Sequence, residues 1–373
     1  MPYEILSGDH VVAQTGDFDR ITVIDPDRCP LYLKRWDDFS GWLENRAIDH
    51  HRTNSRILKR VLRLSEKNDR ATALYFNAAT ITDNFWVREK GSSLQYSEVR
   101  FKGNLFDQVA LRGSTSGFTL RPSRTPELTN TGSYEKCWKR MDGRWNMIKQ
   151  ESLAAIFSEI FIFRLGTALG FPMASYRRYD RSTVQSEDFT ADGKFNLQTA
   201  RALIGEDYES DFIYNCKVFE KLSPELLKQY LAILFMDALV MNYDRHVDNY
   251  GVLTDPESGA ILSMAPNFDN NLALLTNDLP KWEPVMSFLC DYRDLFSEYP
   301  APPVSADQLD AAISLAYSAA ASQFTPDELH SLRPQSEIRA FILQSRCMVC
   351  GQEPAQSCGM DLSPEAQPDG PEL

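Results

Sequence analysis

Three polar residues in the second half of the chain have the types and order that phosphoryl transfer requires. Asp244 is followed five residues later by Asn249, and Asp269 comes after a further apolar stretch. Phosphoryl transfer needs one carboxylate facing the acceptor hydroxyl, and an amide and a second carboxylate that hold Mg²⁺ on the nucleotide phosphates. The sequence therefore predicts Asp244 as catalytic base, with Asn249 and Asp269 as ligands of Mg²⁺ or Mn²⁺.

The elements around these residues give a reason for their spacing. Ser223-Pro224-Glu225 predicts a helix start, and the apolar residues that follow carry that helix directly to the segment before Asp244. Residues 250–253 predict a strand, 255–259 a turn and 260–264 a return strand. Such a hairpin brings Asp269 back beside Asn249.

A simpler alternative is that these residues only cap helices and fill turns, because Asp, Asn and Gly are common in loops. That explanation suffices for any one of them, but less well for the ordered set joined by a hairpin. For the neighbouring Arg245 and His246 we expect structural support of the catalytic loop, with Arg245 paired to a carboxylate of the same lobe.

A second pair of charged residues lies upstream. Residues 144–150 predict a strand that carries Lys149, and Glu159 falls on the helix predicted over about 151–169. A strand lysine held by a helix glutamate positions nucleotide phosphates in kinases. Lys149 and Glu159 are therefore predicted to bind ATP, although a surface lysine and a solvated glutamate remain the alternative.

The expected phosphate loop is the weakest motif. The segment 129–137 contains Gly132, Ser133 and Lys136 but no recognised glycine-rich signature. A single glycine among small polar residues could let backbone N–H groups approach a phosphate. An ordinary hairpin turn explains the segment equally well.

Composition restricts the class of protein. The chain has 373 residues, 24% of them charged, and a formal net charge of −13, without a dense basic segment. General nucleic-acid binding is therefore not expected.

The sequence contains no signal peptide and no apolar run of 18 residues. We therefore expect a soluble, cytoplasmic protein with reduced thiols and no membrane contact. Whether Cys347, Cys350 and Cys358 bind a metal stays open, because a structural zinc needs four ligands.

The pattern of elements predicts an α+β protein in several parts. We expect an N-terminal accessory α/β subdomain at 1–111, with short strands to about residue 35 and helices after it. A small sheet-plus-helix lobe follows at 112–194, then a mainly helical lobe at 195–346 with helix starts at Ser305 and Thr325, and a disordered tail at 347–373. Residues 93–111 are predicted to form a linking strand and turn.

The motifs Asn-x-Asp-Arg-His-x-x-Asn-x-Gly at 242–251 and Ala-Pro-x-x-Asp-Asn at 265–270 resemble the HipA-like serine/threonine kinases, which are bacterial toxin-type kinases with a two-lobed, protein-kinase-like fold. The resemblance covers residues 125–340 and implies the roles given above for Asp244, Asn249, Asp269, Lys149 and Glu159. It also implies ATP and Mg²⁺ as cofactors and a hinge near Glu187–Phe189. Residues 1–110 show no clear match.

Regulation follows less directly from this resemblance. In the family a serine of the phosphate loop can be autophosphorylated, and Ser133 is the matching candidate, although Gly-Ser-Tyr-Glu-Lys departs from the usual form. An antitoxin-like protein is the partner that the resemblance suggests. The leading hypothesis is phosphoryl transfer to Ser/Thr of a protein. The alternatives are a lipid or small-molecule kinase and a non-catalytic nucleotide-binding interaction protein.

Overall fold

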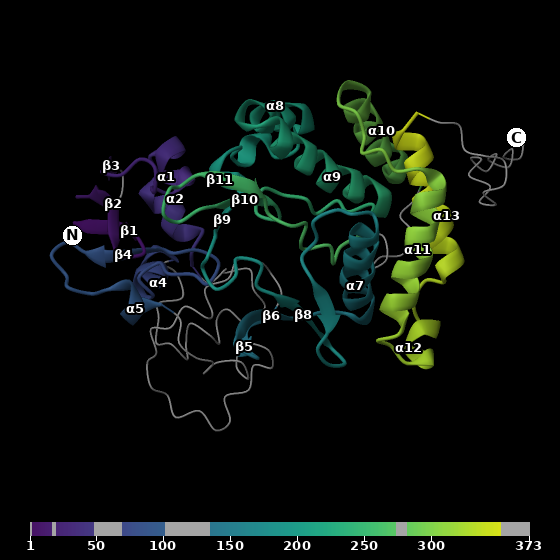
Figure 1. Cartoon of the computed structure of the whole chain (residues 1–373), viewed down its shortest axis with the longest axis horizontal. Helices are drawn as coiled ribbons and strands as arrows, with labels where there is room; N and C mark the ends of the chain where they lie inside the picture. The colour runs from purple at the N-terminus through teal and green to yellow at the C-terminus, as the bar shows by residue number, and fades with distance from the viewer. Residues whose placement is uncertain (1, 17–19, 48–68, 101–134, 274–281, 352–373) are drawn as a thin grey trace, which may run out of the picture.

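The protein is an elongated molecule with a sheet at the N-terminal end, a layer of helices at the C-terminal end, and two small sheets between them (Figure 1). The computed structural model describes residues 2–16, 20–47, 69–100, 135–273 and 282–351. The strand predicted at 115–120 and most of the tail predicted at 347–373 lie outside these ranges.

The N-terminal region is a four-stranded antiparallel sheet in the order β3-β2-β1-β4, with helices packed on it. Ile5, Val12 and Val87 alternate along their strands and pack against Phe39 and Leu43 of the helices in a separate hydrophobic core. The elements are β1 Tyr3–Ser7, β2 His10–Thr15, β3 Thr22–Val23, α1 Leu31–Trp36, α2 Phe39–Glu44, α4 Asp69–Tyr75, β4 Phe85–Glu89 and α5 Tyr96–Val99.

Two local predictions in this region are wrong. Leu31 and Leu33 belong to helix α1, which begins after Pro30 and ends where Asp37 adopts a left-handed conformation. Apolar residues two apart fit a strand, but proline at a helix start and a left-handed residue at its end favour one short helical turn. Tyr96–Val99 forms helix α5, stabilised by a capping box between Gln95 and Glu98, instead of a linking strand.

The middle region is a second antiparallel sheet, in the order β5-β6-β8-β7, with one long helix in the connection between β6 and β7. Strand β6 has the bounds predicted for it. Helix α7 begins at Ser152, whose hydroxyl accepts a hydrogen bond from Ala155 N at 3.2 Å. Its elements are β5 Lys136–Met141, β6 Arg144–Gln150, α7 Leu153–Ala168, β7 Tyr176–Arg178 and β8 Thr183–Glu187.

The last region is mainly helical, as predicted, and the caps at Ser223, Ser305 and Thr325 all begin helices. It also contains a three-stranded sheet, because β9 pairs with the predicted hairpin β10–β11. Its elements are β9 Asn196–Thr199, the 3₁₀ turns Ala200–Ala202 and Glu206–Tyr208, α8 Phe212–Leu222, α9 Pro224–Val240, β10 Gly251–Thr254, β11 Ile261–Met264, α10 Trp282–Glu298, α11 Ala306–Ala321, α12 Pro326–His330 and α13 Gln335–Val349.

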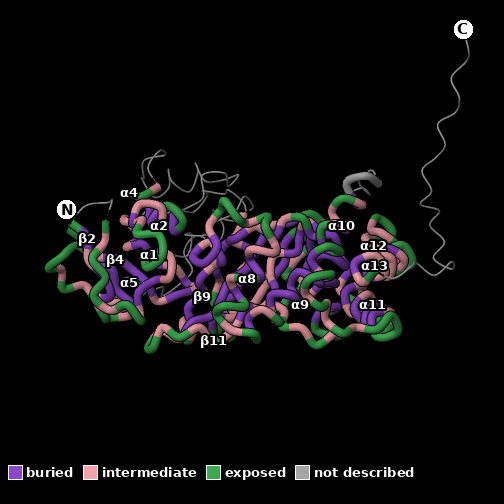
Figure 2. Tube along the Cα trace, turned by 90° about the horizontal axis from the view of Figure 1, so that it is seen from above, coloured by how far each residue is buried: buried purple, intermediate pink, exposed green. Residues whose placement is uncertain are grey.

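One continuous hydrophobic core joins the middle and last regions, and its buried residues run along the inside of the molecule (Figure 2). Phe157 of α7 lies 5.5 Å, between ring centroids, from both Tyr317 and Phe324. Arg178 of β7 forms two hydrogen bonds, of 2.6 and 2.7 Å, with the Glu328 carboxylate of α12. Helix α7 is therefore packed firmly against the C-terminal helices.

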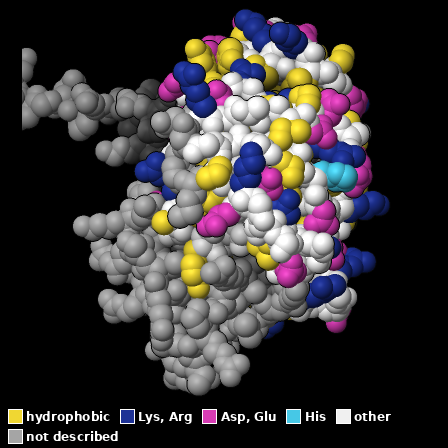
Figure 3. All heavy atoms as spheres, turned by 90° about the vertical axis from the view of Figure 1, so that its left-hand side faces the viewer, with side chains coloured by type: hydrophobic (Ala, Val, Ile, Leu, Met, Phe, Trp, Pro, Cys, Tyr) yellow, Lys and Arg dark blue, Asp and Glu magenta, His cyan; other side chains and the backbone are white. Residues whose placement is uncertain are grey.

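The N-terminal region docks onto β9 of the last region through backbone contacts. Leu197 N donates to Thr82 O at 2.8 Å, and Asn84 N donates to the Asn196 side chain at 2.9 Å. Side chains of both charges are interspersed over the described part of the face that this end presents (Figure 3). The docking places Thr80–Asp83 beside the sheet of the middle region, where they line the cavity described below.

Candidate active site

The middle sheet presents one face to a cavity of about 860 Å³. The antiparallel register places Lys136 opposite Lys149 and Trp138 opposite Met147, and Lys149 opposite Val184 on the next strand. Because side chains alternate along a strand, residues two apart share a face. The residues of this face that line the cavity are Lys136, Trp138, Met147, Lys149, Val184 and Ser186.

The other walls of the cavity come from all three regions. The loop after α9 contributes Asp244 and Asn249, the segment after β11 contributes Phe268 and Asp269, and the N-terminal region contributes Thr80–Asp83. A volume of this size is within the range of pockets that hold cofactors and small ligands. No motif of the sequence indicates that the first hundred residues form part of this wall.

Lys149 lies at the centre of a group of carboxylates. Its Nζ atom is 2.6 Å from Asp269 Oδ1, 2.7 Å from Glu151 Oε1 and 3.8 Å from Glu159 Oε1. The Lys149, Glu151 and Glu159 side chains are all buried, whereas 26% of the Asp269 side chain is exposed. One ammonium group therefore faces three carboxyl groups, and only Asp269 has appreciable access to the cavity.

The pKa values in this group follow from burial and charge. Burial alone would lower the pKa of Lys149, but Asp269, Glu151 and Glu159 outweigh it and hold that pKa well above its usual value. Burial acts to raise the pKa of Asp269, yet the charges of Lys149 and Lys136 lower it to about 2. Lys149 is therefore a cation and Asp269 an anion at neutral pH.

Glu159 differs from the other carboxylates because it is completely buried. Its Oε2 atom accepts a hydrogen bond from Asn270 N at 2.9 Å, whereas Oε1 has no hydrogen-bond partner among the described residues. Burial, which Lys149 only partly offsets, raises the pKa of Glu159 to about 8. The predicted Lys149–Glu159 pair is thus brought together, but at a longer distance than either of the other two carboxylates.

Asp244 and Asn249 lie in one loop and are linked to each other. Asn249 Nδ2 donates to the Asp244 carbonyl oxygen at 2.8 Å, which leaves the Oδ1 atom of the same amide as the atom suited to a metal. Asp244 is partly buried, and its pKa is raised, first by burial and then by the negative charge of Asp269, against the lowering effect of His246. A carboxylate with a raised pKa is a better proton acceptor.

Arg245 holds this loop against the segment that carries Asp269. Its guanidinium group forms two 2.9 Å hydrogen bonds with the buried Asp237 carboxylate of α9, as expected for a pair within one lobe. It also donates to four neutral oxygens: the carbonyls of Asn249 and Phe268 at 2.6 and 2.8 Å, and the side chains of Asn267 and Asn270 at 2.9 and 2.8 Å. A single buried side chain thus fixes the spacing between Asn249 and Asp269.

His246 lies at the edge of the same loop with its side chain 41% exposed. Its Nδ1 atom accepts a hydrogen bond from Asp248 N at 3.3 Å. The Asp248 carboxylate pairs in turn with Arg201, at 2.8 and 2.5 Å, and so ties the loop to the residues after β9. These contacts are what a supporting role for His246 requires.

The backbone at two motif positions is tightly constrained. Asp269 has a φ of 61°, a left-handed conformation that Asp adopts more readily than most residues, and its N–H donates to the Tyr176 hydroxyl at 3.0 Å. At Gly251, a Cβ atom would lie 2.3 Å from Gln198 O of the neighbouring strand. The motif glycine therefore permits the close pairing of β9 with β10.

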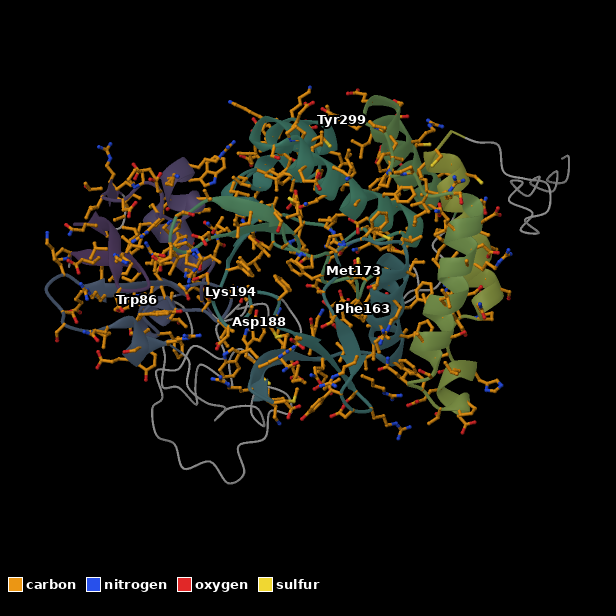
Figure 4. All side chains as sticks on the ribbon, viewed as in Figure 1. Trp86, Phe163, Met173, Asp188, Lys194 and Tyr299 are labelled. Carbon is orange, nitrogen blue, oxygen red and sulfur yellow. The ribbon has the colours of Figure 1, made fainter. Side chains whose placement is uncertain are left out.

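The remaining predicted positions have mixed outcomes. Gly132 and Ser133 lie outside the described residues, whereas Lys136 lines the cavity. Glu187–Phe189, the expected hinge, also line it, and Asp188 lies where the N-terminal region meets the middle sheet (Figure 4). The Asp188 carboxylate accepts hydrogen bonds from Thr190 N and Asp192 N at 2.8 and 2.9 Å, so it stabilises the turn after β8.

Sequence reasoning did not identify Glu151, Asn271 or Tyr176. Glu151 follows Lys149 by two residues, a spacing that places both side chains on one face of an extended segment. That spacing was the available signal for Glu151. Asn271 and Tyr176 carry no such signal, because they reach the site only through the fold.

Metal binding was tested on the donor atoms that are present. In the parts of the chain that the structure describes, no three His, Cys, Asp or Glu side chains form a ready-made metal site, Cys347 and Cys350 included. Asn249 and Asp269 nevertheless supply hard oxygen atoms that line the cavity. Mg²⁺ is usually held by one or two carboxylates together with substrate phosphates, so this donor set fits Mg²⁺.

Within the described ranges, no helix combines the length and apolar character needed to cross a bilayer.

The fold of this chain is similar to that of a solved protein structure. The chain resembles HipA in the Shewanella oneidensis MR-1 toxin–antitoxin complex of HipA, HipB and operator DNA, with a TM-score of 0.61 and 14% identity over 94% of this chain and 98% of that one. This is a HipA-like, two-lobed kinase fold. The share covered also corrects the expectation for residues 1–110, most of which must lie within the match.

Other comparisons add little. The proinflammatory kinase CtkA of Helicobacter pylori matches with a TM-score of 0.40 and 18% identity, over 60% of this chain and 92% of that one. No family model and no curated protein sequence matches the chain.

Proposed function

We propose that this protein is an ATP- and Mg²⁺-dependent kinase that transfers a phosphoryl group to a serine or threonine hydroxyl of a protein. The observation that carries the proposal is the convergence of Lys149, Asp244, Asn249 and Asp269 on one cavity. Lys149 comes from strand β6, 120 positions before Asp269 in the segment after β11, and Asp244 and Asn249 come from the loop after α9. A shared role in one reaction accounts for their arrangement more simply than separate roles in folding.

Each residue has a defined task in this reaction. Asp244 accepts the proton of the acceptor hydroxyl while the oxygen forms its bond to the γ-phosphorus and the bond to the β-phosphate oxygen breaks, which releases ADP. Lys149 and Lys136 hold the phosphates by charge. Asn249 and Asp269 would hold Mg²⁺, which neutralises charge on the phosphates when it is bound. Arg245 keeps the two ligands at a fixed spacing.

Incubation with labelled ATP and Mg²⁺ tests the proposal. We expect label on the protein itself or on a serine or threonine of added protein, and a loss of at least about 10²-fold in Asp244→Asn, because a general base contributes roughly 10²–10⁴-fold. Asp269→Asn should abolish transfer as well. Nucleotide binding without transfer would favour a non-catalytic role, and transfer only to a lipid or small molecule would favour the other kinase class.

Autophosphorylation and the partner are further parts of the proposal. A phosphate-sized mass increment that maps to Ser133, and is absent in Asp244→Asn, would identify the autophosphorylation site. The HipA fold was solved together with HipB and operator DNA, which supports an antitoxin-like protein as the partner here. The net charge of −13 favours contact with DNA through such a partner instead of direct binding.

A further inference from the structure

Glu151 is the carboxylate outside the predicted set that contacts Lys149 directly. Its Oε1 atom lies 2.7 Å from Lys149 Nζ, and its side chain is 1% exposed. The same Oε1 atom accepts a hydrogen bond from Asn271 Nδ2 at 3.0 Å, and Glu151 N donates to Ser182 O at 3.0 Å. Glu151 is thus held on one side by the middle sheet and on the other by the segment that carries Asp269.

Glu159 makes a weaker contact with the same lysine. Its nearest oxygen is 3.8 Å from Lys149 Nζ, which is beyond hydrogen-bonding distance, and its other oxygen is bonded to Asn270 N. The carboxyl group of the helix therefore makes no direct hydrogen bond to Lys149. The direct hydrogen bonds to the ammonium group come from Glu151 and Asp269.

Glu151 and Asp269, the direct carboxylate partners of Lys149 in the described part of the chain, differ in what they can do during a reaction. Asp269 faces the cavity, with 26% of its side chain exposed, and is the carboxylate proposed to bind the metal. A carboxylate oxygen that ligates a metal interacts less strongly with a neighbouring ammonium group. Glu151 is buried and anchored by Asn271, so it can keep its contact with Lys149 when Asp269 turns toward the metal.

We propose that Glu151 is the positioning residue that holds Lys149 toward the nucleotide phosphates, and that Asn271 orients Glu151. This inference rests on the proposed function, because it assigns Lys149 to phosphate binding. Glu151 acts only through Lys149 and touches no reacting atom. The alternative is that Glu151 contributes only to folding, since a buried carboxylate next to a lysine also stabilises the start of α7.

An ATP-binding titration of the full-length protein distinguishes a positioning role of Glu151 from a role in folding only. The titration is run once with Mg²⁺ and once without it. We expect Glu151→Gln to weaken Mg-ATP binding about tenfold or more, because it replaces the charged acceptor of the Lys149 ammonium group with a neutral amide, which holds that group less strongly. In transfer assays the KM for ATP should rise by a similar factor, while kcat falls less. Glu159→Gln should raise the KM by a smaller factor than Glu151→Gln.

Matched variants make the outcome decisive. Glu220→Gln, on the exposed side of α8 and away from the cavity, controls for the loss of one negative charge. Asn271→Ser removes the donor to Glu151 Oε1 and should raise the KM in the same direction. If Glu151→Gln failed to fold, the Asn271→Ser result would decide alone: a raised KM supports the proposal, and an unchanged KM overturns it.

Two other results would overturn the inference. One is a KM in Glu159→Gln that rises as much as in Glu151→Gln or more. The other is a Glu151→Gln protein that melts at a lower temperature but binds Mg-ATP as tightly as the natural protein. Failure of the proposed function is distinguishable, because the natural protein itself would then bind no Mg-ATP.

Discussion

Arg245 and Lys149 are two of the buried cations around the cavity, and their surroundings differ in the balance of charge. Arg245 faces one carboxylate, Asp237, and its other donors are used by neutral oxygens. Lys149 faces three carboxyl groups, of which Asp269 has access to the cavity. The first centre is balanced, with one carboxylate for one cation, whereas the second has a surplus of carboxyl groups: three surround one ammonium group, and one of them, Glu159, keeps a proton up to about pH 8.

This difference separates a structural centre from a functional one. A buried ion pair with every donor used fixes a geometry, and removal of one partner is costly because the other is left buried and unpaired. A surplus of carboxylates is unfavourable in the protein alone and becomes favourable when a cation binds. The Arg245 centre therefore holds the loops in place, and the Lys149 centre is the one that we propose receives Mg²⁺ with a nucleotide.

The largest effect on folding is expected at the balanced centre. Arg245→Met should lower the free energy of unfolding by about 3–5 kcal/mol, because Asp237 remains buried without its partner. Denaturant unfolding measures this loss. Arg293→Met is the matched control, since that side chain is 50% exposed and pairs with the adjacent Asp294. The control should change stability by less than about 0.5 kcal/mol, and equal losses in the two variants would contradict the comparison.

The largest effect on activity is expected at the surplus centre. Lys149→Met should lower kcat/KM for ATP by about 10²–10³-fold, the usual result of removing one electrostatic contact to the reacting group. Its effect on stability should be smaller than that of Arg245→Met, because Asp269 reaches solvent and Glu159 can bind a proton. Steady-state kinetics and unfolding of the same preparation test both parts. A Lys149→Met protein that unfolds as readily as Arg245→Met would remove the distinction between the two centres.

Stability should also depend on pH through the surplus centre. The Glu159 pKa is raised by burial from 4.5 to about 8, so the folded protein keeps a proton that the unfolded chain has released over that range. This contribution to stability is complete below pH 4.5 and is lost as the pH rises toward about 8. Urea unfolding between pH 5 and 8, in the absence of nucleotide, should show the decline in the natural protein and a shallower one in Glu159→Gln. Equal slopes in the two proteins would argue that Glu159 is ionised in the folded state.

The smallest effect is expected at a pair away from the cavity, Arg178 and Glu328, whose side chains are 13% and 14% exposed and which serves as a reference for both centres. The Glu328 pKa is lowered to about 2, first by its hydrogen bonds to Arg178 and then by Thr325 N. Because this pKa is depressed, the pair stabilises the protein above pH 4.5 and loses that effect as the pH falls through about 2. Thermal unfolding of Glu328→Gln at pH 7 should show a smaller loss than Arg245→Met. A loss as large as that of Arg245→Met would show that exposure is a poor guide to the strength of these pairs.

Much of the local structure could be predicted because its causes are local. Strand β6, the β10–β11 hairpin and the helices that begin at Ser223, Ser305 and Thr325 follow from alternation and from capping side chains within a few residues. The short helix at Leu31 was missed because Leu-x-Leu fits a strand as well as a helix. The division of the chain at residues 111, 194 and 346 stays a prediction.

The sequence by itself determined the candidate residues Asp244, Asn249 and Asp269, since their types and order carry the chemistry. Only the tertiary structure decided how charge is distributed around Lys149. Its contact with Asp269 and the contact of Glu151 with Asn271 each join residues 120 positions apart. Which residues form such distant contacts depends on how the sheet, α7 and the loop after β11 pack together. No spacing along the chain records that packing, so a sequence motif can supply the lysine but cannot say which carboxylate holds it.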